Sequence, residues 1–243
     1  MQSWGLTDPG CVRTQNQDAF QIVQLDRFTQ LCVVCDGMGG AKSGNIASSL
    51  AIDVFVQEIK RVHKSGMSRE QVEQMLRGAA KLANFTVYDQ AQEVEDFGGM
   101  GTTLVAVYIT GRRATIVNVG DSRCYAVNRE GIQQITTDHS LVQMMLRRGE
   151  LTEEQARFYP GRNYITRAIG TEPTVECDIF SWKLERGDAL LLCSDGLHGI
   201  VDDQEMLFEV VHGVNKANCC QRLLNIAKSR GAPDNVTSVL VMT

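Results

Sequence analysis

No apolar run in this chain approaches the roughly 18–20 residues that a membrane-spanning helix requires. Residues 1–5 carry neither the basic cluster nor the apolar stretch of a secretory signal. There is no basic stripe either, and the formal net charge is −5, which gives no support for a nucleic-acid-binding surface. We therefore expect a cytoplasmic protein with no membrane span and no nucleic-acid partner.

The sequence also lacks a repeat of fixed period, a low-complexity tract and an interdomain linker. Its 243 residues are enough for a full hydrophobic core, and 43% hydrophobic with 22% charged residues is typical of a globular protein. We expect one domain that spans residues 1–243.

The eight cysteines do not indicate a disulfide framework. Cys32, Cys35 and Cys193 lie inside apolar runs, where a reduced thiol packs as a small hydrophobic group. Cys32 and Cys35 form a C-x-x-C motif, but residues three apart in an extended strand face opposite sides. A redox or zinc role for this pair is therefore not favoured.

What the chain does contain is a recurring pattern in which a short apolar run ends at an aspartate. Residues 31–35 lead to Asp36, residues 189–193 lead through a serine to Asp195, and residues 115–119 lead more loosely to Asp121. Short apolar runs bounded by glycines predict buried strands. Because Asp-Gly is also an ordinary turn, one such ending is weak evidence, but three in one chain indicate a common cause.

Two further aspartates precede predicted strands. Asp18 stands before a strand expected at residues 20–25, and the turn at residues 26–27 leads back into the strand before Asp36. This hairpin puts Asp18 and Asp36 at the same sheet edge. Asp234 precedes the last predicted strand, residues 236–241. If neighbouring strands alternate in direction, all five aspartates gather at one rim.

Such a rim has defined chemistry. Five close carboxylates cannot all stay ionised without cations, and oxygen ligands without His or Cys favour Mg²⁺ or Mn²⁺ over zinc. A pair of these ions lowers the pKa of a bridging water and assists in-line displacement at phosphorus. Arg13, five residues before Asp18, is well placed to bind a phosphate with two hydrogen bonds.

The remaining pattern is mixed. Helical periodicity predicts helices at residues 46–62 and 72–87, the second opened by a capping box of Ser68 and Gln71. Residues 5–10 predict a turn-rich entry, and residues 138–170 are irregular and helical, which is typical of a lid or flap. A continuous antiparallel meander is expected from four strands: 104–109, 115–119, 124–127 and 132–135.

Six motifs in this order resemble the PPM family, the metal-dependent type-2C protein Ser/Thr phosphatases, and in particular its compact bacterial members. They span residues 13–237, nearly the whole chain, and their joint order is highly specific. The motifs are Arg13…Asn16-Gln17-Asp18-Ala19-Phe20, Cys35-Asp36-Gly37-Met38-Gly39-Gly40, Gly101-Thr102-Thr103, Val119-Gly120-Asp121-Ser122-Arg123, Ser194-Asp195-Gly196 and Asp234-Asn235-Val236-Thr237.

The resemblance implies an α+β fold, a four-layer α-β-β-α sandwich in which helices flank two central antiparallel sheets. The segment at about 138–170 corresponds to the family's flap beside the active cleft. The implied activity is hydrolysis of phosphoserine and phosphothreonine by a water or hydroxide that bridges two Mn²⁺ or Mg²⁺ ions. The implied partners are phosphorylated proteins, substrates of a bacterial Ser/Thr kinase in signalling, and a monomer is expected.

The metal ligands follow from the same resemblance. Asp36 would bridge both metals and the Gly37 carbonyl would coordinate one of them. Asp195 and Asp234 would complete the other shell, and Asp18 would orient a metal-bound water.

Arg13, Asp18 and Asp36 are the catalytic residues that the resemblance implies, with Arg13 holding the substrate phosphate. Asp121 matches the position that serves a weaker third metal in bacterial relatives.

This sequence departs from the family pattern at three positions. Met38 replaces a histidine found in many eukaryotic relatives, so that general acid is absent and leaving-group protonation would fall to a metal-bound water or another group. Gln17 replaces a glutamate of some relatives. His198 and Gly199 stand where relatives often have another acid, which weakens the third-metal site at Asp121.

Two other functions remain open at this stage. One is a catalytically silent phosphopeptide-binding module on the same fold, and the other is a two-metal phosphodiesterase acting on small molecules. The sequence around Lys42-Ser43 is not a nucleotide-binding P-loop, because Asp36 and Ala41 occupy the two positions where that motif requires glycine. For His139, within the expected flap, a structural role is favoured over a catalytic one.

Overall fold

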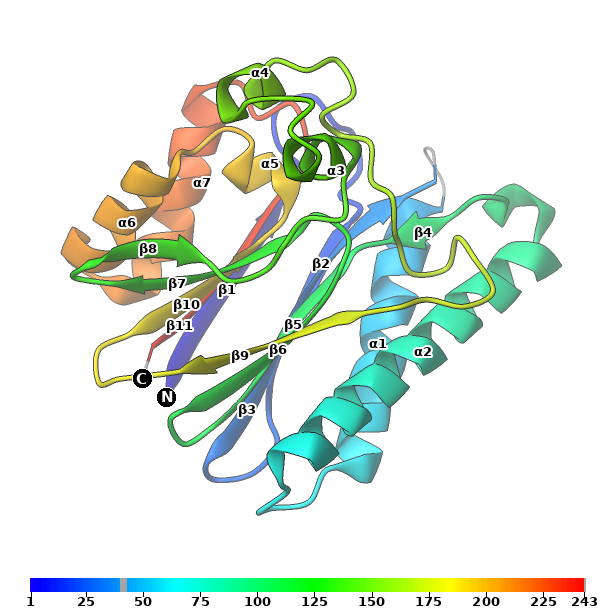
Figure 1. Cartoon of the computed structure of the whole chain (residues 1–243), viewed down its shortest axis with the longest axis horizontal. Coiled ribbons are helices and arrows are strands. Elements are labelled where there is room, and N and C mark those ends of the chain that lie inside the picture. The colour runs from blue at the N-terminus through cyan, green and yellow to red at the C-terminus, as the bar shows by residue number, and fades with distance from the viewer. Residues whose placement is uncertain (40–42, 243) are drawn as a thin grey trace.

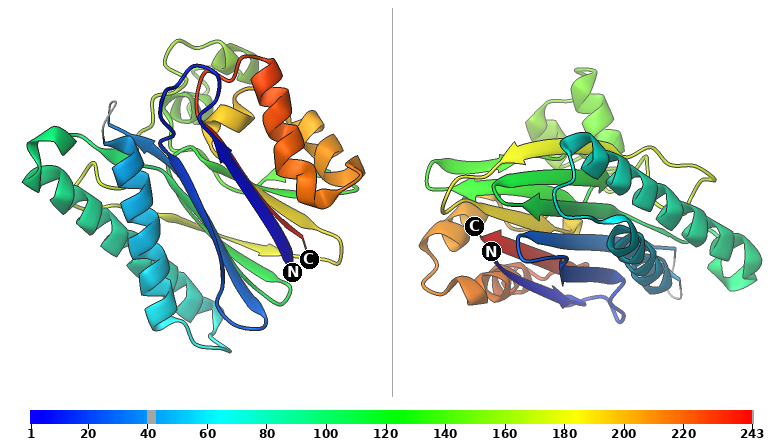
Figure 2. Two further views of the ribbon diagram at one scale, coloured as in Figure 1. Left: turned by 180° about the vertical axis from the view of Figure 1, so that it is seen from behind. Right: turned by 90° about the horizontal axis from the view of Figure 1, so that it is seen from below.

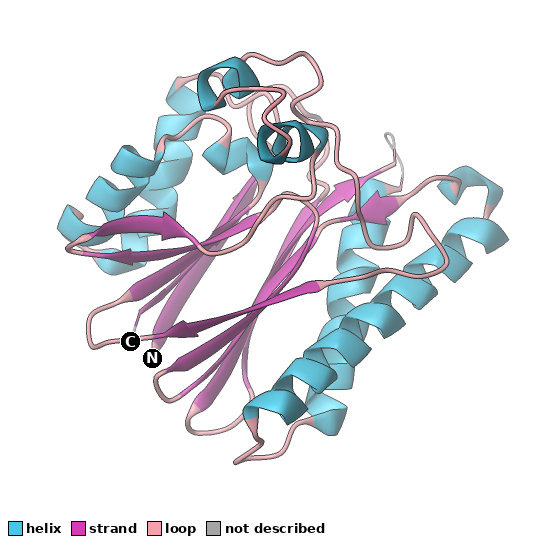
Figure 3. Ribbon diagram, in the orientation of Figure 1, coloured by secondary structure: helices cyan, strands magenta, loops and turns pink. Residues whose placement is uncertain are grey.

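The computed structural model describes residues 1–39 and 43–242. Gly40 and Lys42, which belong to two of the motifs considered above, lie outside the described residues. Two antiparallel sheets are stacked at the centre of the molecule, with helices on the outer face of each (Figures 1 and 3). The predicted α+β fold, a four-layer α-β-β-α sandwich, is confirmed.

The first sheet has the strand order β1-β11-β10-β7-β8. Its first two strands pair along their whole length, from Gln2 opposite Met242 to Asp8 opposite Val236, so the two chain ends lie side by side (Figure 1). Helices α5, α6 and α7 pack on its outer face. The elements are β1 (Gln2–Asp8), β7 (Arg123–Asn128), β8 (Gly131–Gln134), β10 (Ala189–Cys193), β11 (Val236–Met242), α5 (Asp195–His198), α6 (Asp203–His212), the 3-10 turn η2 (Lys216–Asn218) and α7 (Cys219–Ser229).

The second sheet has the order β2-β3-β5-β6-β9, and the short β4 pairs with the end of β3. The two longest helices, α1 and α2, cover its outer face. Ser68 caps α2 in the expected capping box with Gln71. The elements are β2 (Asp18–Gln24), β3 (Thr29–Met38), α1 (Gly44–Val62), α2 (Arg69–Glu93), η1 (Glu95–Phe97), β4 (Gly101–Thr102), β5 (Leu104–Thr110), β6 (Arg113–Val119) and β9 (Asp178–Lys183).

Apolar side chains fill the three spaces between these four layers. One core lies between α1, α2 and the second sheet, another between the first sheet and α5–α7, and the third between the two sheets. Cys35 belongs to the first core and Cys32 to the third, so the two thiols face opposite sides of β3 as expected. Within the described chain, no helix has the length and apolarity that crossing a membrane requires.

The structure corrects the sequence analysis at two places. Residues 5–8 belong to β1 rather than to a turn, and Gly5 is needed there because a Cβ atom would lie 2.4 Å from the Phe20 ring. The expected meander is divided between the sheets: β5 and β6 lie in one, β7 and β8 in the other. The chain passes from the second sheet to the first at Gly120, whose φ of +105° favours glycine.

The segment between β8 and β9 rises above one end of both sheets (Figures 1 and 2). It contains α3 (Leu141–Arg147) and α4 (Glu153–Arg157), and a capping box of Thr152 and Gln155 opens α4. Its two ends meet where Ser140 pairs with Ile165. This segment occupies the position expected of the flap.

Candidate active site

The β2–β3 hairpin sets the position of the first two aspartates. Asp18 and Asp36 are direct partners in its antiparallel register, so the two carboxylates share one sheet edge as predicted. The apolar residues before Asp36 are completely buried, which fixes the strand that carries it.

The Gly101-Thr102-Thr103 motif holds the Asp36 backbone. The Asp36 N–H donates to Thr103 Oγ1 at 2.9 Å, and the Asp36 carbonyl accepts from the Thr103 N–H and from Thr102 Oγ1, both at 2.9 Å. The Thr103 and Ser122 hydroxyls lie 2.7 Å apart, which ties this strand end to the turn that carries Asp121.

Gly37 is a glycine because three backbone segments meet around it. A Cβ atom at this position would lie 2.0 Å from the Gly44 carbonyl oxygen and 2.6 Å from that of Gln17. No other residue fits here without displacing the start of α1, and the buried Gly37 backbone lines the cleft.

Asp18 is held by a buried serine. Ser194 Oγ donates to Asp18 Oδ2 at 2.7 Å and accepts from the Thr237 N–H at 3.0 Å. Ser194 directly precedes Asp195, so this contact links the first aspartate to the fourth. No sequence pattern indicates this bridge, because Ser194 and Asp18 lie 176 positions apart.

Arg13 and Asp234, which both line the cleft, form an ion pair. Arg13 Nη2 donates to Asp234 Oδ2 at 2.9 Å, and 54% of the Arg13 side chain remains exposed. The guanidinium therefore lies beside the carboxylates and is still accessible to a ligand.

These groups line one cleft of about 440 Å³. Asp36, Gly37, Asp121, Asp195, Asp234 and Arg13 all line it, and Asn163 and Ile165 of the flap contribute to its wall. Asp18 is buried next to Asp36 and does not line the cleft. The structure thus brings together all the site residues that the sequence analysis named.

The carboxylates lie close enough to oppose one another's ionisation. Burial raises the pKa of Asp18 to about 7 and that of Asp121 to about 8, and the nearby Asp195 charge adds to both effects. Burial and the charges of Asp18 and Asp195 raise the pKa of Asp36 well above its usual value. The pKa of Asp195 is also raised, by burial and by Asp234.

This donor set fits divalent metal ions. Asp18 Oδ1 and Asp195 Oδ1 are buried and have no hydrogen-bond partner in the described structure, which is unfavourable unless a cation or proton compensates them. All the side-chain donors are hard oxygens, which suits Mg²⁺ or Mn²⁺. Over the described residues, no three His, Cys, Asp or Glu side chains are arranged as a group that could hold a metal ion. The fit to divalent ions therefore rests on the hard-oxygen chemistry of the carboxylates in this cleft and on the two unpartnered oxygens.

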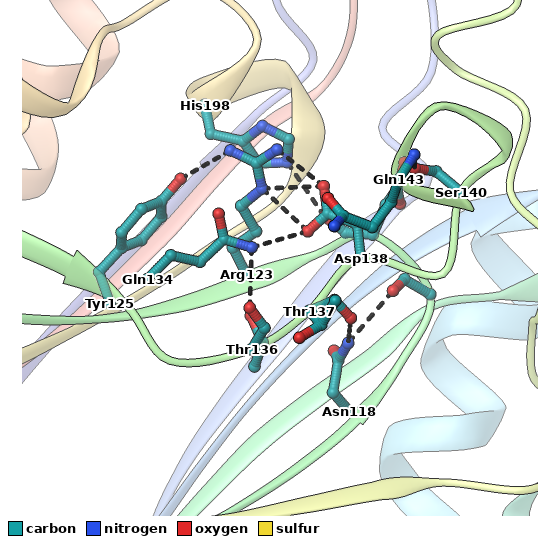
Figure 4. Close-up of polar contacts among 12 residues, drawn as sticks. Asn118, Arg123, Tyr125, Gln134, Thr136, Thr137, Asp138, Ser140, Gln143 and His198 are labelled. Carbon is teal, nitrogen blue, oxygen red and sulfur yellow. Dashed lines mark hydrogen bonds and ion pairs between the residues drawn. The ribbon is translucent and has the colours of Figure 1, made fainter. Parts of the chain in front are cut away.

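A polar network connects Arg123, Asp138 and Tyr125 (Figure 4). Arg123 binds both Asp138 oxygens, at 2.7–3.1 Å, and also donates to the Tyr125 hydroxyl at 2.9 Å. Asp138 begins the flap, so this buried ion pair fixes the flap's first residue to β7. His198 Nε2 donates to the Asp121 carbonyl at 3.1 Å, and burial lowers the pKa of His198 to about 3. A neutral His198 thus positions the Asp121 backbone.

His139 has a structural role, as the sequence analysis favoured. Its Nδ1 accepts from the Gly120 N–H at 3.0 Å, and its Nε2 lies 3.0 Å from Arg167 Nη1 and 3.2 Å from Asp178 Oδ2. Burial lowers the pKa of His139, and the residue does not line the cleft. His139 thus joins the flap to Gly120, where the chain passes between the two sheets.

Comparison with known proteins identifies strong similarity along the whole chain. Residues 12–231 match the family model described as Protein phosphatase 2C. The chain is 35% identical to "Serine/threonine phosphatase stp" of Listeria monocytogenes over 235 residues, 97% of this chain and 93% of that one. It is 34% identical to "Protein phosphatase PhpP" of Streptococcus pneumoniae, over 97% of this chain and 95% of that one.

Solved structures of serine/threonine phosphatases are also similar to this chain over nearly its whole length. The serine/threonine phosphatase of S. agalactiae superposes with a TM-score of 0.93 at 32% identity, covering 100% of this chain and 99% of that chain. Serine/threonine phosphatase Stp1 from Staphylococcus aureus gives a TM-score of 0.93 at 37% identity, covering 99% of this chain and 94% of that chain. At these identities the likeness extends beyond the fold.

Proposed function

The chain belongs to the protein phosphatase 2C family and is a metal-dependent serine/threonine protein phosphatase; from this premise we propose the identity of its ions and the roles of its cleft residues. The observation that carries the proposal is the single cleft in which Asp36, Asp121, Asp195 and Asp234 meet beside Arg13. Phosphorylated proteins are its substrates.

We propose that two Mn²⁺ or Mg²⁺ ions bind this cleft. Asp36 would contact both, the Gly37 carbonyl one, and Asp195 and Asp234 the other. Asp18 would orient a water at the ions, and Asp121 would hold a weaker third ion. The unpartnered oxygens of Asp18 and Asp195 support this assignment. When bound, such ions supply Lewis-acid polarisation of the phosphate and an activated water.

The protein's own groups bind and orient the substrate. Arg13 offers a planar guanidinium with two parallel donors, which suits a phosphate oxygen pair. Its hydrogen bond to Asp234 holds that fork at the rim of the cleft. Met38 lines the cleft where many eukaryotic relatives have histidine, so the side chain there cannot transfer a proton. Ser194 holds Asp18 in place through Asp18 Oδ2, and Asp18 Oδ1 has no hydrogen-bond partner.

The remaining parts of the proposal concern organisation and context. We propose a single phosphatase domain over residues 1–243 that acts as a monomer and reverses the action of a bacterial Ser/Thr kinase. A cytoplasmic location is supported by the cysteines, because all eight are free and seven are buried.

Metal titration and turnover test the proposal together. Isothermal titration of metal-free protein with Mn²⁺ should give about two tight sites, and hydrolysis of a phosphothreonine peptide should stop in EDTA. The Asp36→Asn variant should lose both the tight binding and turnover. The matched control, Asp53→Asn, changes an exposed carboxylate on α1 and should retain both. Full turnover of the wild type in EDTA would refute the metal roles.

Substrate comparison separates the phosphatase from a phosphodiesterase. The wild type should hydrolyse the phosphopeptide and leave a cyclic nucleotide intact. Anomalous scattering from crystals soaked in Mn²⁺ would count the ions and identify their ligands, including any at Asp121.

A further inference from the structure

Asn235 is a buried amide whose hydrogen bonds all go to one loop. Only 4% of the residue is exposed. Its Nδ2 donates to the carbonyls of Pro9, at 3.0 Å, and Gln15, at 2.9 Å, and its Oδ1 accepts from the Gln17 N–H at 2.8 Å. One side chain therefore holds both ends of the loop at residues 9–17.

This loop carries Arg13. Residues 11–15 are exposed and belong to no strand or helix, so they depend on contacts at the loop ends for their position. Other contacts also hold the loop. The Cys11 N–H donates to the Ala232 carbonyl at 2.9 Å, Asn16 Nδ2 donates to Thr7 Oγ1 at 2.7 Å, and the Gln17 carbonyl accepts from the Gly37 N–H at 3.0 Å. Arg13 itself is held through Asp234.

The chemistry of the site requires an amide. Two carbonyls need two N–H donors and one N–H needs an acceptor, and within this volume only asparagine supplies all three. Aspartate would offer acceptors alone and would face two carbonyl oxygens. Because the buried carbonyls would then have no donor, the loop ends would move toward water.

We infer that Asn235 is the positioning residue for Arg13. It holds the loop at residues 9–17 in the conformation that places the Arg13 guanidinium at the cleft. This inference rests on the proposed role of Arg13 in binding the substrate phosphate. Asn235 acts through the loop, because its own side chain is fully used by three backbone partners. The backbone N–H of Asn235 donates to Asp234 Oδ1 at 2.9 Å, a contact that side-chain substitution leaves in place.

Limited digestion with trypsin measures loop position without metal or substrate. In EDTA, cleavage after Arg13 should be on the order of tenfold faster in Asn235→Ala than in the wild type, because the loss of even one net hydrogen bond shifts the opening equilibrium by nearly that factor. Cleavage after the exposed Arg129, at the β7–β8 turn, is the internal reference and should not change.

The chain offers a matched control at that turn. Asn128 Oδ1 accepts from the Glu130 and Gly131 N–H groups at 2.8 and 3.2 Å, so it fixes an exposed turn that also carries an arginine. The turn lies at the opposite end of the first sheet from Asp195 and Asp234. Asn128→Ala should therefore accelerate cleavage after Arg129 and leave cleavage after Arg13 unchanged.

Steady-state kinetics with a phosphopeptide at saturating Mn²⁺ test whether Asn235 acts through Arg13. Asn235→Ala should raise KM on the order of tenfold with a smaller change in kcat. In the Arg13→Ala background the same substitution should raise KM no further, because the group it positions is gone.

The outcomes are distinct. An equal rise in KM with and without Arg13, or unchanged cleavage after Arg13, would overturn the inference. If Asn235→Ala does not fold, the isosteric Asn235→Asp, which keeps the acceptor for Gln17 and loses both donors, should show the same digestion and kinetics. A wild type without phosphatase turnover would instead refute the proposed function, while the digestion result would still decide whether Asn235 holds the loop.

Discussion

Replacing Asp18 by asparagine should stabilise the metal-free protein, and increasingly so as the pH rises. Asp18 is buried, and burial raises its pKa from 3.8 to about 7. Between about pH 4 and pH 7 the folded state keeps this proton and the unfolded chain does not. The free energy of unfolding therefore falls as pH rises across that window, and the loss is complete above about pH 7.

The magnitude follows from the width of the window. One pKa unit corresponds to about 1.4 kcal/mol, so an ionised Asp18 destabilises the metal-free fold at pH 8 by on the order of 4 kcal/mol. An unfolded carboxyl already ionises at pH 5, so roughly 2–3 kcal/mol of this effect develops between pH 5 and pH 8. Asparagine stays neutral at both pH values, and its side-chain oxygen can still accept from Ser194.

The assay is thermal unfolding in EDTA at both pH values. The Tm advantage of Asp18→Asn over the wild type should grow by about 5–10 °C from pH 5 to pH 8. Asp53→Asn, at an exposed position on α1, should change Tm equally at both. An advantage of Asp18→Asn that stays constant with pH would show that the carboxylate is not held ionised at a cost. With Mn²⁺ the wild type should gain more stability than the variant, because ion binding favours the folded state.

Arg13→Ala should raise KM for a phosphopeptide by about 10–100-fold with a smaller effect on kcat, the expected result of losing a charge-assisted phosphate contact; an unchanged KM would contradict the role. Arg123→Met should lower the free energy of unfolding by about 2–4 kcal/mol in chemical denaturation, because it leaves Asp138 buried without its partner; a neutral effect would show that the ion pair does not hold the flap. Tyr108→Phe removes the hydroxyl that lies 3.0 Å from His63 Nδ1, far from the cleft, and should lower stability by about 1 kcal/mol with kcat and KM unchanged; altered kinetics would contradict that separation.

The sequence was sufficient for the rim of carboxylates because their positions depend on local strand patterns. The pairing of Asp18 with Asp36 required only a hairpin, and hairpin register follows from the turn and the alternation of apolar residues. The division of the meander between two sheets was not predictable in the same way. The crossing at Gly120 looks like any short turn in the sequence, and only packing against Thr103 distinguishes it.

The missed contributors share one property, which is that their partners are remote in the sequence. Strand β1 pairs with β11 across the length of the chain, so the glycine and proline near residues 5–10 dominated the local signal. His198 contacts the carbonyl of Asp121, 77 positions away, and its sequence neighbours give no indication of this bond. Backbone acceptors carry no residue identity, so no pattern of residue types can reveal them.

The difference between local strand patterns and contacts from remote segments also explains how the site is built. The carboxylates repel one another, which favours separating the strand ends that bear them, and local strand propensity cannot oppose that repulsion. Neutral side chains from distant segments do so instead: Ser194 holds Asp18, His198 holds the Asp121 backbone, and Asn235 holds the loop of Arg13. Because these groups carry no charge, they fix geometry without neutralising the carboxylates, whose charge remains available for the ions. Ion binding should therefore stabilise the wild type more than Asp18→Asn, because the ions compensate a buried carboxylate that the variant no longer has.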